Sequence, residues 1–252
     1  MSAHATFDLA QGLLRLAPAT LDVLLGTPGR ERNGAEPHLA ALREAGVLGL
    51  EGIHPEVEAA LAPMQRPVCE LVVRDGGRPA EGWMASNAVT FVVAGDDGLV
   101  DVSVLHPSLL PWTLAALVEL GPRRRSQTAA KLRLGRADLE RLLGSREPEA
   151  GRGSAREEAP EEVERALDAL AGARRWRAEA RWSGPGGQRS ERAVEAIDTD
   201  AGLWLIEPDG SELSLRPVTS TTAWRLLIRL PPRSYELGPE PRTVGAGAPP
   251  AN

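Results

Sequence analysis

The amino-acid sequence predicts an α+β protein built from two similar halves. Helix-like segments flank runs of strand-like residues, in which apolar and polar side chains alternate. Short sequence matches relate the two parts of the chain, and they occur in the same order in both. We therefore predict that each half contains a helix, a meander of about four strands and a second helix.

Differences in composition divide the chain into four segments. Residues 144–160 contain no apolar side chain larger than alanine, so they cannot bury enough surface to offset the entropy of ordering. We expect a flexible linker loop there, between an N-terminal half (1–143) and a repeated C-terminal half (161–235). For the same reason we expect residues 236–252 to form a disordered tail.

Helix signals dominate the N-terminal part of the chain. Pro18 divides the apolar segment Phe7–Leu25, which favours a short strand or turn followed by a short helix. A helix is predicted from His38 to Ala45, with Gly46 as its stop signal. Another is predicted from Pro55 to Met64, because proline is favoured at the first helical position.

Strand signals follow. Val68–Arg74 is apolar, and Gly82–Ala94 predicts two extended pieces around Asn87. The sequence Asp96-Asp97-Gly98 is typical of a hairpin turn. The next strand alternates valines with polar residues, which indicates a sheet with one buried and one solvated face; the valines are Val100, Val102 and Val104.

Each meander is expected to end in a helix. The first of these helices is predicted to be capped by Ser108, with Trp112 inside it, and the second spans Thr219–Leu230. The first strand of the second meander, 176–182, places tryptophan and alanine on one face and charged residues on the other. The remaining strands are predicted around Ala193–Ile197, Leu203–Glu207 and Leu213–Pro217.

Four matches carry the prediction of an internal repeat. Their offsets rise from the first pair to the third and then stay constant along the chain, as small insertions in a duplicated unit would produce. The matched pairs are Pro55–Leu61 with Glu161–Leu167, Gly76-Gly77 with Gly186-Gly187, Asp97-Gly98 with Asp209-Gly210, and Trp112 with Trp224.

Composition favours a cytoplasmic protein without membrane insertion. No segment approaches the roughly 20 apolar residues of a membrane span, and the N-terminus lacks the pattern of a signal peptide. The lone cysteine, Cys69, lies in a strand-like run, where we expect a buried thiol. The net charge of −6 argues against bulk binding of nucleic acid.

The sequence contains no recognisable reaction centre. Its four histidines lack metal-ligand spacing, and His54 and His106 precede prolines at helix entrances, where they are expected to cap. Asp96 and Asp97 fit turn positions and Asp101 fits the solvated face of its strand. A structural role rather than acid–base chemistry is expected for these three and for Asp198 and Asp200. We expect no catalytic, cofactor-binding or metal-binding residue, no cofactor and no enzymatic activity. The six tryptophans mostly fall on apolar faces and are expected in the core.

The order of elements resembles the EspG family of chaperones, which serve ESX (type VII) secretion in actinobacteria. The resemblance covers residues 5–232 and rests on Phe7-Asp8-Leu9, Leu42–Val47, Leu61–Pro67 and the repeated half. A family pattern, Asp-Thr-x-x-Gly-Arg-Tyr, is matched in part by 198–204, where Leu203 and Trp204 depart from it.

The resemblance implies both a fold and a function. The fold would be a quasi-two-fold structure with a central, mostly antiparallel sheet and a helical bundle. The protein would shield an apolar tip of a secreted helical PE–PPE-like pair. Its contacts would come from bundle helices and from the loop between the first two long strands, which is Asp75, Gly76, Gly77, Arg78, Pro79, Ala80 and Glu81. The oligomeric state stays open.

A regulatory nucleic-acid-binding protein is the alternative. It would use Leu39–Met64 as a helix-turn-helix-like piece and the basic cluster Arg123–Arg136 as a phosphate contact. The acidic total charge and the absence of a basic recognition helix argue against it. The run Arg123-Arg124-Arg125 also fits a solvated helix end, where cations complement the helix dipole.

Overall fold

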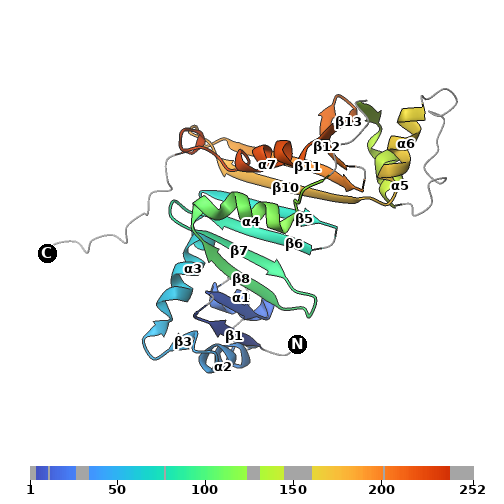
Figure 1. Cartoon of the computed structure of the whole chain (residues 1–252). Helices are drawn as coiled ribbons and strands as arrows, with labels where there is room; N and C mark the ends of the chain where they lie inside the picture. Colours follow the sequence, from blue (N-terminus) through green and yellow to red (C-terminus); the bar gives the residue numbers. More distant parts are fainter. Residues whose placement is uncertain are drawn as a thin grey trace.

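One antiparallel sheet of eleven strands runs through the whole molecule (Figure 1). The computed structural model describes residues 4–10, 12–26, 34–76, 78–123, 131–144, 161–200 and 202–238. Along the sheet the strands follow the order β1-β2-β8-β7-β6-β5-β10-β11-β12-β13-β9. The predicted α+β class with a central antiparallel sheet is therefore confirmed.

The sheet consists of two meanders that meet in the middle. The first contains β5 (Cys69–Asp75), β6 (Arg78–Met84), β7 (Val89–Ala94) and β8 (Val100–Leu105), and is extended by β2 (Leu13–Leu16) and β1 (Ala5–Asp8). The second contains β10 (Arg174–Ser183), β11 (Arg189–Thr199), β12 (Gly202–Asp209) and β13 (Glu212–Val218), and is extended by β9 (Leu132–Leu134).

The two meanders join through the β5–β10 pair. These strands are antiparallel and remain in register from Trp176 opposite Asp75 to Trp182 opposite Cys69. Side chains alternate across β10, so Trp176, Ala178, Ala180 and Trp182 are buried on one face. The alternation that the sequence predicted for this strand is confirmed.

Helices cover the two faces of the sheet differently. The face that carries Trp176 packs against α4 (Leu110–Leu117) and α7 (Ser220–Ile228), which lie side by side in Figure 1. On the opposite face, α3 (Pro55–Gln65) packs on the first meander. The helices α5 (Arg136–Gly144) and α6 (Glu161–Leu170) pack on the second meander.

A small N-terminal unit lies beside the first meander. It contains α1 (Pro18–Leu24), α2 (Glu36–Glu44) and a two-stranded ribbon of β3 (Leu48–Gly49) and β4 (Gly52–Ile53). Leu42 and Val47 are buried against Leu14, Leu16 and α3. The predicted helices in this region are confirmed within a few residues at their ends.

The entrance to α4 differs from the prediction. A short 3-10 turn, η2 (Pro107–Leu109), precedes α4. The side chain of His106, rather than that of Ser108, caps this turn. The His106 Nδ1 atom accepts a hydrogen bond from the Ser108 backbone N–H at 3.3 Å. His54 caps α3 in the same way through the Glu56 N–H, as expected for a histidine before a helix-initiating proline.

Two predicted boundaries also differ from the packing. Although they lie within 1–143, β9 pairs with β13 and α5 packs against α6, so both belong to the second half. Residues 236–238, assigned to the tail, are placed: the Glu236 carbonyl accepts a hydrogen bond from the Trp182 indole. Residues 145–160 and 239–252 lie outside the described residues.

The four sequence matches fall on equivalent elements of the two meanders. They lie on α3 and α6, at the first turn of each meander, at the third turn of each meander, and on α4 and α7. The rings of Trp112 and Trp224 contact each other, with centroids 4.5 Å apart. Gene duplication itself stays a prediction.

Val104 departs from the predicted buried face, since it is 38 % exposed.

The close approach of β6 to β7 gives a stability test. A Cβ atom built on Gly82 would lie 2.7 Å from Cε1 of Phe91, whose side chain is buried in the sheet core. We expect Gly82→Ala to lower the free energy of unfolding by about 1–3 kcal/mol, measured by urea denaturation. Gly144→Ala is the matched control, because a Cβ at Gly144 meets nothing within 4 Å. Equal stability of the two variants would contradict this packing.

Candidate partner-binding site

The segment that was expected to bind a partner is the β5–β6 hairpin. The prediction of a loop over residues 75–81 was too long, because β6 begins at Arg78 and its residues pair with β5 up to Asp75. Only residues 76 and 77 lie between the strands; Gly76 has a φ of +56°, and Gly77 lies outside the described residues. The start of β6 was not predicted because it contains Pro79, and proline is depleted in strands.

The hairpin has one buried and one exposed side. Ala80 points into the core that α4 and α7 cover, whereas Pro79 and Glu81 are exposed. Glu81 lies opposite Val72 of β5, which in turn lies opposite Glu179 of β10. The exposed side of the hairpin therefore continues directly into the outer face of β10.

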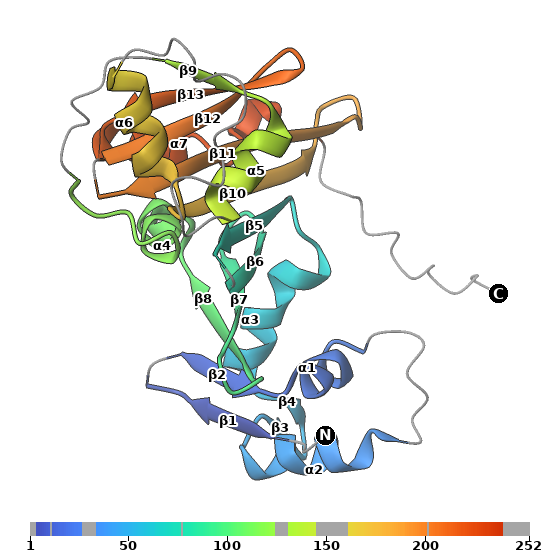
Figure 2. The same cartoon turned by 90° about the vertical axis from the view of Figure 1, so that its right-hand side faces the viewer.

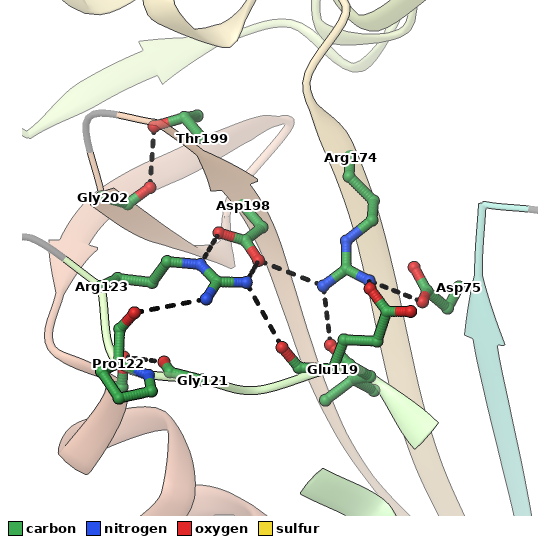
Figure 3. Close-up of polar contacts among 11 residues, drawn as sticks. Asp75, Glu119, Gly121, Pro122, Arg123, Arg174, Asp198, Thr199 and Gly202 are labelled. Carbon is green, nitrogen blue, oxygen red and sulfur yellow. Dashed lines mark hydrogen bonds and ion pairs between the residues drawn. The ribbon is translucent and has the colours of Figure 1, made fainter. Parts of the chain in front are cut away.

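An arginine from the second half holds the end of this hairpin (Figure 3). Arg174, at the start of β10, donates to Asp75 Oδ2 and to Glu119 Oε2, each at 2.8 Å. Its other terminal nitrogen donates to the Val118 carbonyl at 2.8 Å and to Asp198 Oδ2 at 3.1 Å. One guanidinium thus joins β5, the end of α4, β10 and β11.

Arg123 completes the cluster from the segment after α4. Its Nε and Nη2 atoms donate to the two carboxylate oxygens of Asp198 at 2.8 and 2.7 Å, a bidentate geometry (Figure 3). Two residues earlier, the Gly121 carbonyl accepts a hydrogen bond from the Ser220 hydroxyl at the start of α7. We name Asp75, Glu119, Arg123, Arg174 and Asp198 the arginine clamp.

The carboxylates of the clamp are in different electrostatic states. Burial by itself raises the pKa of Asp198, but hydrogen bonds and charges from Arg123 and Arg174 outweigh it, so the pKa lies below its ordinary value. Burial has the largest effect on Asp75 and raises the pKa of its carboxyl group. The charge of Arg174 lowers this pKa, whereas the charges of Glu119 and Asp198 raise it, so the pKa lies above its ordinary value. Asp198 is therefore the carboxylate that both guanidinium groups stabilise.

A strip of alternating charges lies on the outer face of β10 and β11. Arg177 forms ion pairs with Glu179 and Glu195, each at 3.1 Å. Arg175 pairs with Glu195 and Arg181 pairs with Glu179 on the same face. Glu179 is only 3 % exposed in its side chain although it carries a charge. Figure 2 shows these central strands between α3 on one side and α5 with α6 on the other.

The basic cluster proposed as a phosphate contact is engaged within the protein. Arg123 binds Asp198, and both Lys131 and Arg133 pair with Asp209, at 3.6 and 3.2 Å. The segment proposed as a helix-turn-helix contains the β3–β4 ribbon between its helices. Arg123, Lys131 and Arg133 are thus paired within the protein, while residues 124–130 of this cluster lie outside the described residues.

The described residues contain no arrangement typical of a metal or thiol site. No group of three or more histidine, cysteine, aspartate or glutamate side chains is placed there to hold a metal ion. Burial raises the pKa of the Cys69 thiol to about 12, so this sulfur stays protonated at neutral pH. Among the described helices, none is long and apolar enough to cross a membrane.

Comparison with known proteins identifies the family. A model described as the EspG family matches residues 4–223. The chain belongs to the EspG family. No curated protein sequence matches it.

The fold is also similar to a solved member of the EspG family. That structure is of the Mycobacterium tuberculosis type VII secretion system chaperone EspG5 in complex with a PE25–PPE41 dimer. The TM-score is 0.59 at 13 % identity, and the match covers 86 % of this chain and 95 % of EspG5. The likeness shows the fold, and together with the family match it confirms the resemblance drawn from the sequence.

Sequence analysis of this EspG-family chain missed the arginine clamp. The sequence predicted only a structural role for Asp198 and a solvated helix end for Arg123. It gave no prediction for Arg174 or Glu119. Arg123 and Asp198 are 75 residues apart in the chain, and Arg174 and Asp75 are 99 apart. Only the β5–β10 pairing brings these charges together, and no local pattern encodes that pairing.

Asp198 gives a pH-dependent test of the clamp. Its pKa lies below the ordinary 3.8, so its stabilisation is present above pH 3.8 and is lost as the pH falls through the native pKa. We expect Asp198→Asn to lower the free energy of unfolding by about 2 kcal/mol near neutral pH, with a smaller difference from the wild type below pH 3.8. Urea unfolding across this pH range measures both effects.

Asp200→Asn is the control for this test, because Asp200 is exposed in the adjacent turn. We expect it to change the free energy of unfolding by less than about 0.5 kcal/mol. An Asp198→Asn variant as stable as the control near neutral pH would show that the clamp does not stabilise the fold.

Proposed function

We propose that this chain is a cytoplasmic chaperone that binds and shields a secreted, PE–PPE-like helical pair of a type VII (ESX) secretion system. The observation that carries the proposal is the EspG family match over residues 4–223. The fold likeness to EspG5, a chaperone solved with a PE25–PPE41 dimer, supports the same class of client. The activity would be binding without a chemical step, so the protein would not be an enzyme.

The proposed contact surface includes the β5–β6 hairpin, residues 75–81. Pro79 and Glu81 are exposed there, while Arg174 holds Asp75 at the base of the turn. A hairpin that is already ordered loses little conformational entropy when a partner binds, which favours affinity. The clamp thus supports binding by fixing the hairpin before the client arrives.

The outer face of β10 and β11 would contribute specificity. Its arginines and glutamates are paired with one another, so a client must match an existing pattern of charges. An apolar tip of the client would be covered beside this charged strip and thereby kept from aggregating before export. Affinity would come from a few buried anchors, and the polar residues around them would reject other partners.

Affinity purification tests the proposal. The tagged full-length chain is expressed in its own host, and the co-eluting proteins are identified by mass spectrometry. We expect secreted helical proteins of PE–PPE type at near-stoichiometric amounts. Recovery of nucleic acid, or of no protein partner, would mean that the chain shares the EspG fold without the proposed function.

A pair of charge reversals tests the hairpin as the contact surface. Glu81 and Glu51 are both exposed, but Glu51 lies in the β3–β4 turn, away from the hairpin. We expect Glu81→Arg to weaken client binding about tenfold, because it reverses the charge next to the charged strip, and Glu51→Arg to leave binding unchanged. Calorimetry with the co-purified client measures the dissociation constants. Equal effects of the two reversals would reject the hairpin as the site.

A further inference from the structure

The outer face of α4 and α7 exposes large apolar side chains. Leu109 and Trp112 are 51 % and 67 % exposed, and Ile228 is 46 % exposed. Trp112 departs most from the expectation that the tryptophans lie in the core, since Trp176, Trp182 and Trp204 are buried and Trp83 and Trp224 are half-buried. In Figure 1 both helices lie in front of the sheet, and no other labelled element covers them. Exposed apolar side chains that cluster in this way are typical of interaction surfaces.

These side chains form one continuous patch. The Trp112 and Trp224 rings pack at 4.5 Å between centroids and 52° between planes, which joins α4 to α7. Leu109 precedes Trp112 by three residues and Ile228 follows Trp224 by four, so each lies one turn from the tryptophan of its helix. We name Leu109, Trp112, Trp224 and Ile228 the tryptophan patch.

The two helices that carry the patch contain no acidic residue although the protein is acidic. Residues 105–118 and 219–233 contain no aspartate or glutamate, whereas the whole chain has a net charge of −6. Arg225 and Arg229 are exposed on α7 and are spaced by four residues. They therefore form a row beside the Trp224–Ile228 row. The helix pair combines an apolar surface with a positive edge.

We propose that the tryptophan patch binds an acidic amphipathic helix of a second protein. The apolar face of that helix would lie against Trp112, Trp224 and Ile228, and its carboxylates would pair with Arg225 and Arg229. Tryptophan and arginine are the residues that most often dominate binding energy at protein interfaces. Docking of an amphipathic helix on such an apolar surface is a common mode of peptide recognition.

The same charges disfavour other occupants. A second copy of this chain, docked through an isologous interface, would bring two arginine rows together. An anionic membrane is disfavoured because α4 and α7 are only eight and nine residues long and the net charge of −6 opposes approach. An acidic helix satisfies both the apolar patch and the arginine row.

This surface is separate from the proposed client site. The patch lies on the face of the sheet that α4 and α7 cover, whereas Glu81 and the charged strip lie on the opposite face. The proposal therefore does not depend on the chaperone function. A chaperone with both surfaces could hold its client and contact a second protein at the same time.

Calorimetry with two model peptides tests the proposal. Both have about 18 residues, enough for a stable helix, with leucines at positions i, i+3, i+4 and i+7. One carries glutamates on its other positions and the other carries lysines. We expect the full-length chain to bind the acidic peptide at least about tenfold more tightly than the basic one. Equal affinities, or no binding of either peptide, would overturn the proposal.

Variants localise the binding. Trp112→Ser should weaken binding of the acidic peptide about tenfold, and Arg225→Glu with Arg229→Glu should reverse the preference between the peptides. Leu50→Ser is the control, since Leu50 is a fully exposed apolar residue that lies between β3 and β4. Thermal melting verifies that each variant is folded. Unchanged binding by Trp112→Ser would overturn the proposal, as would patch-dependent dimerisation or vesicle binding in place of peptide binding.

Discussion

The antiparallel pairing of β5 with β10 joins the two halves of the molecule. It turns two meanders into a single sheet, so that the apolar faces of both halves share one core beneath α4 and α7. At one end of this pair, Arg174 neutralises carboxylates from both halves. Backbone hydrogen bonds alone would leave the carboxylates of Asp75 and Asp198 close together without the positive charge of Arg174 between them. Like charges in a partly buried site are destabilising.

This pairing also separates the two surfaces of the molecule. Because side chains alternate along β10, Trp176 faces the helices while Arg177 faces outward. The outward face carries ion pairs and leads to the β5–β6 hairpin, which suits recognition of a specific partner. The opposite face is covered by two helices whose own outer surface is apolar and basic.

Local patterns in the sequence predicted most of the elements, because they depend on neighbouring residues. Alternation revealed β10, the Asp97-Gly98 pair revealed a hairpin turn, and prolines marked the start of α3. Features that depend on distant contacts could not be predicted in this way. The three residues of β9 pair with residues of β13 that lie 79 to 83 positions later in the chain, so the sequence alone did not show to which half β9 belongs. Pro79 made the start of β6 unrecognisable in the sequence. The residues of the arginine clamp are distant in the chain, and only the assembled sheet brings them together.

Hydrogen–deuterium exchange can show whether the clamped hairpin and the outer sheet face hold the client. Exchange of the full-length chain is compared with and without the client that affinity purification is expected to identify. We expect slower amide exchange in residues 75–81 and in strands β10 and β11, which carry the outer face of the sheet, when the client is bound. Unchanged exchange in the hairpin, with protection confined to α4 and α7, would contradict it and would move the client to the tryptophan patch.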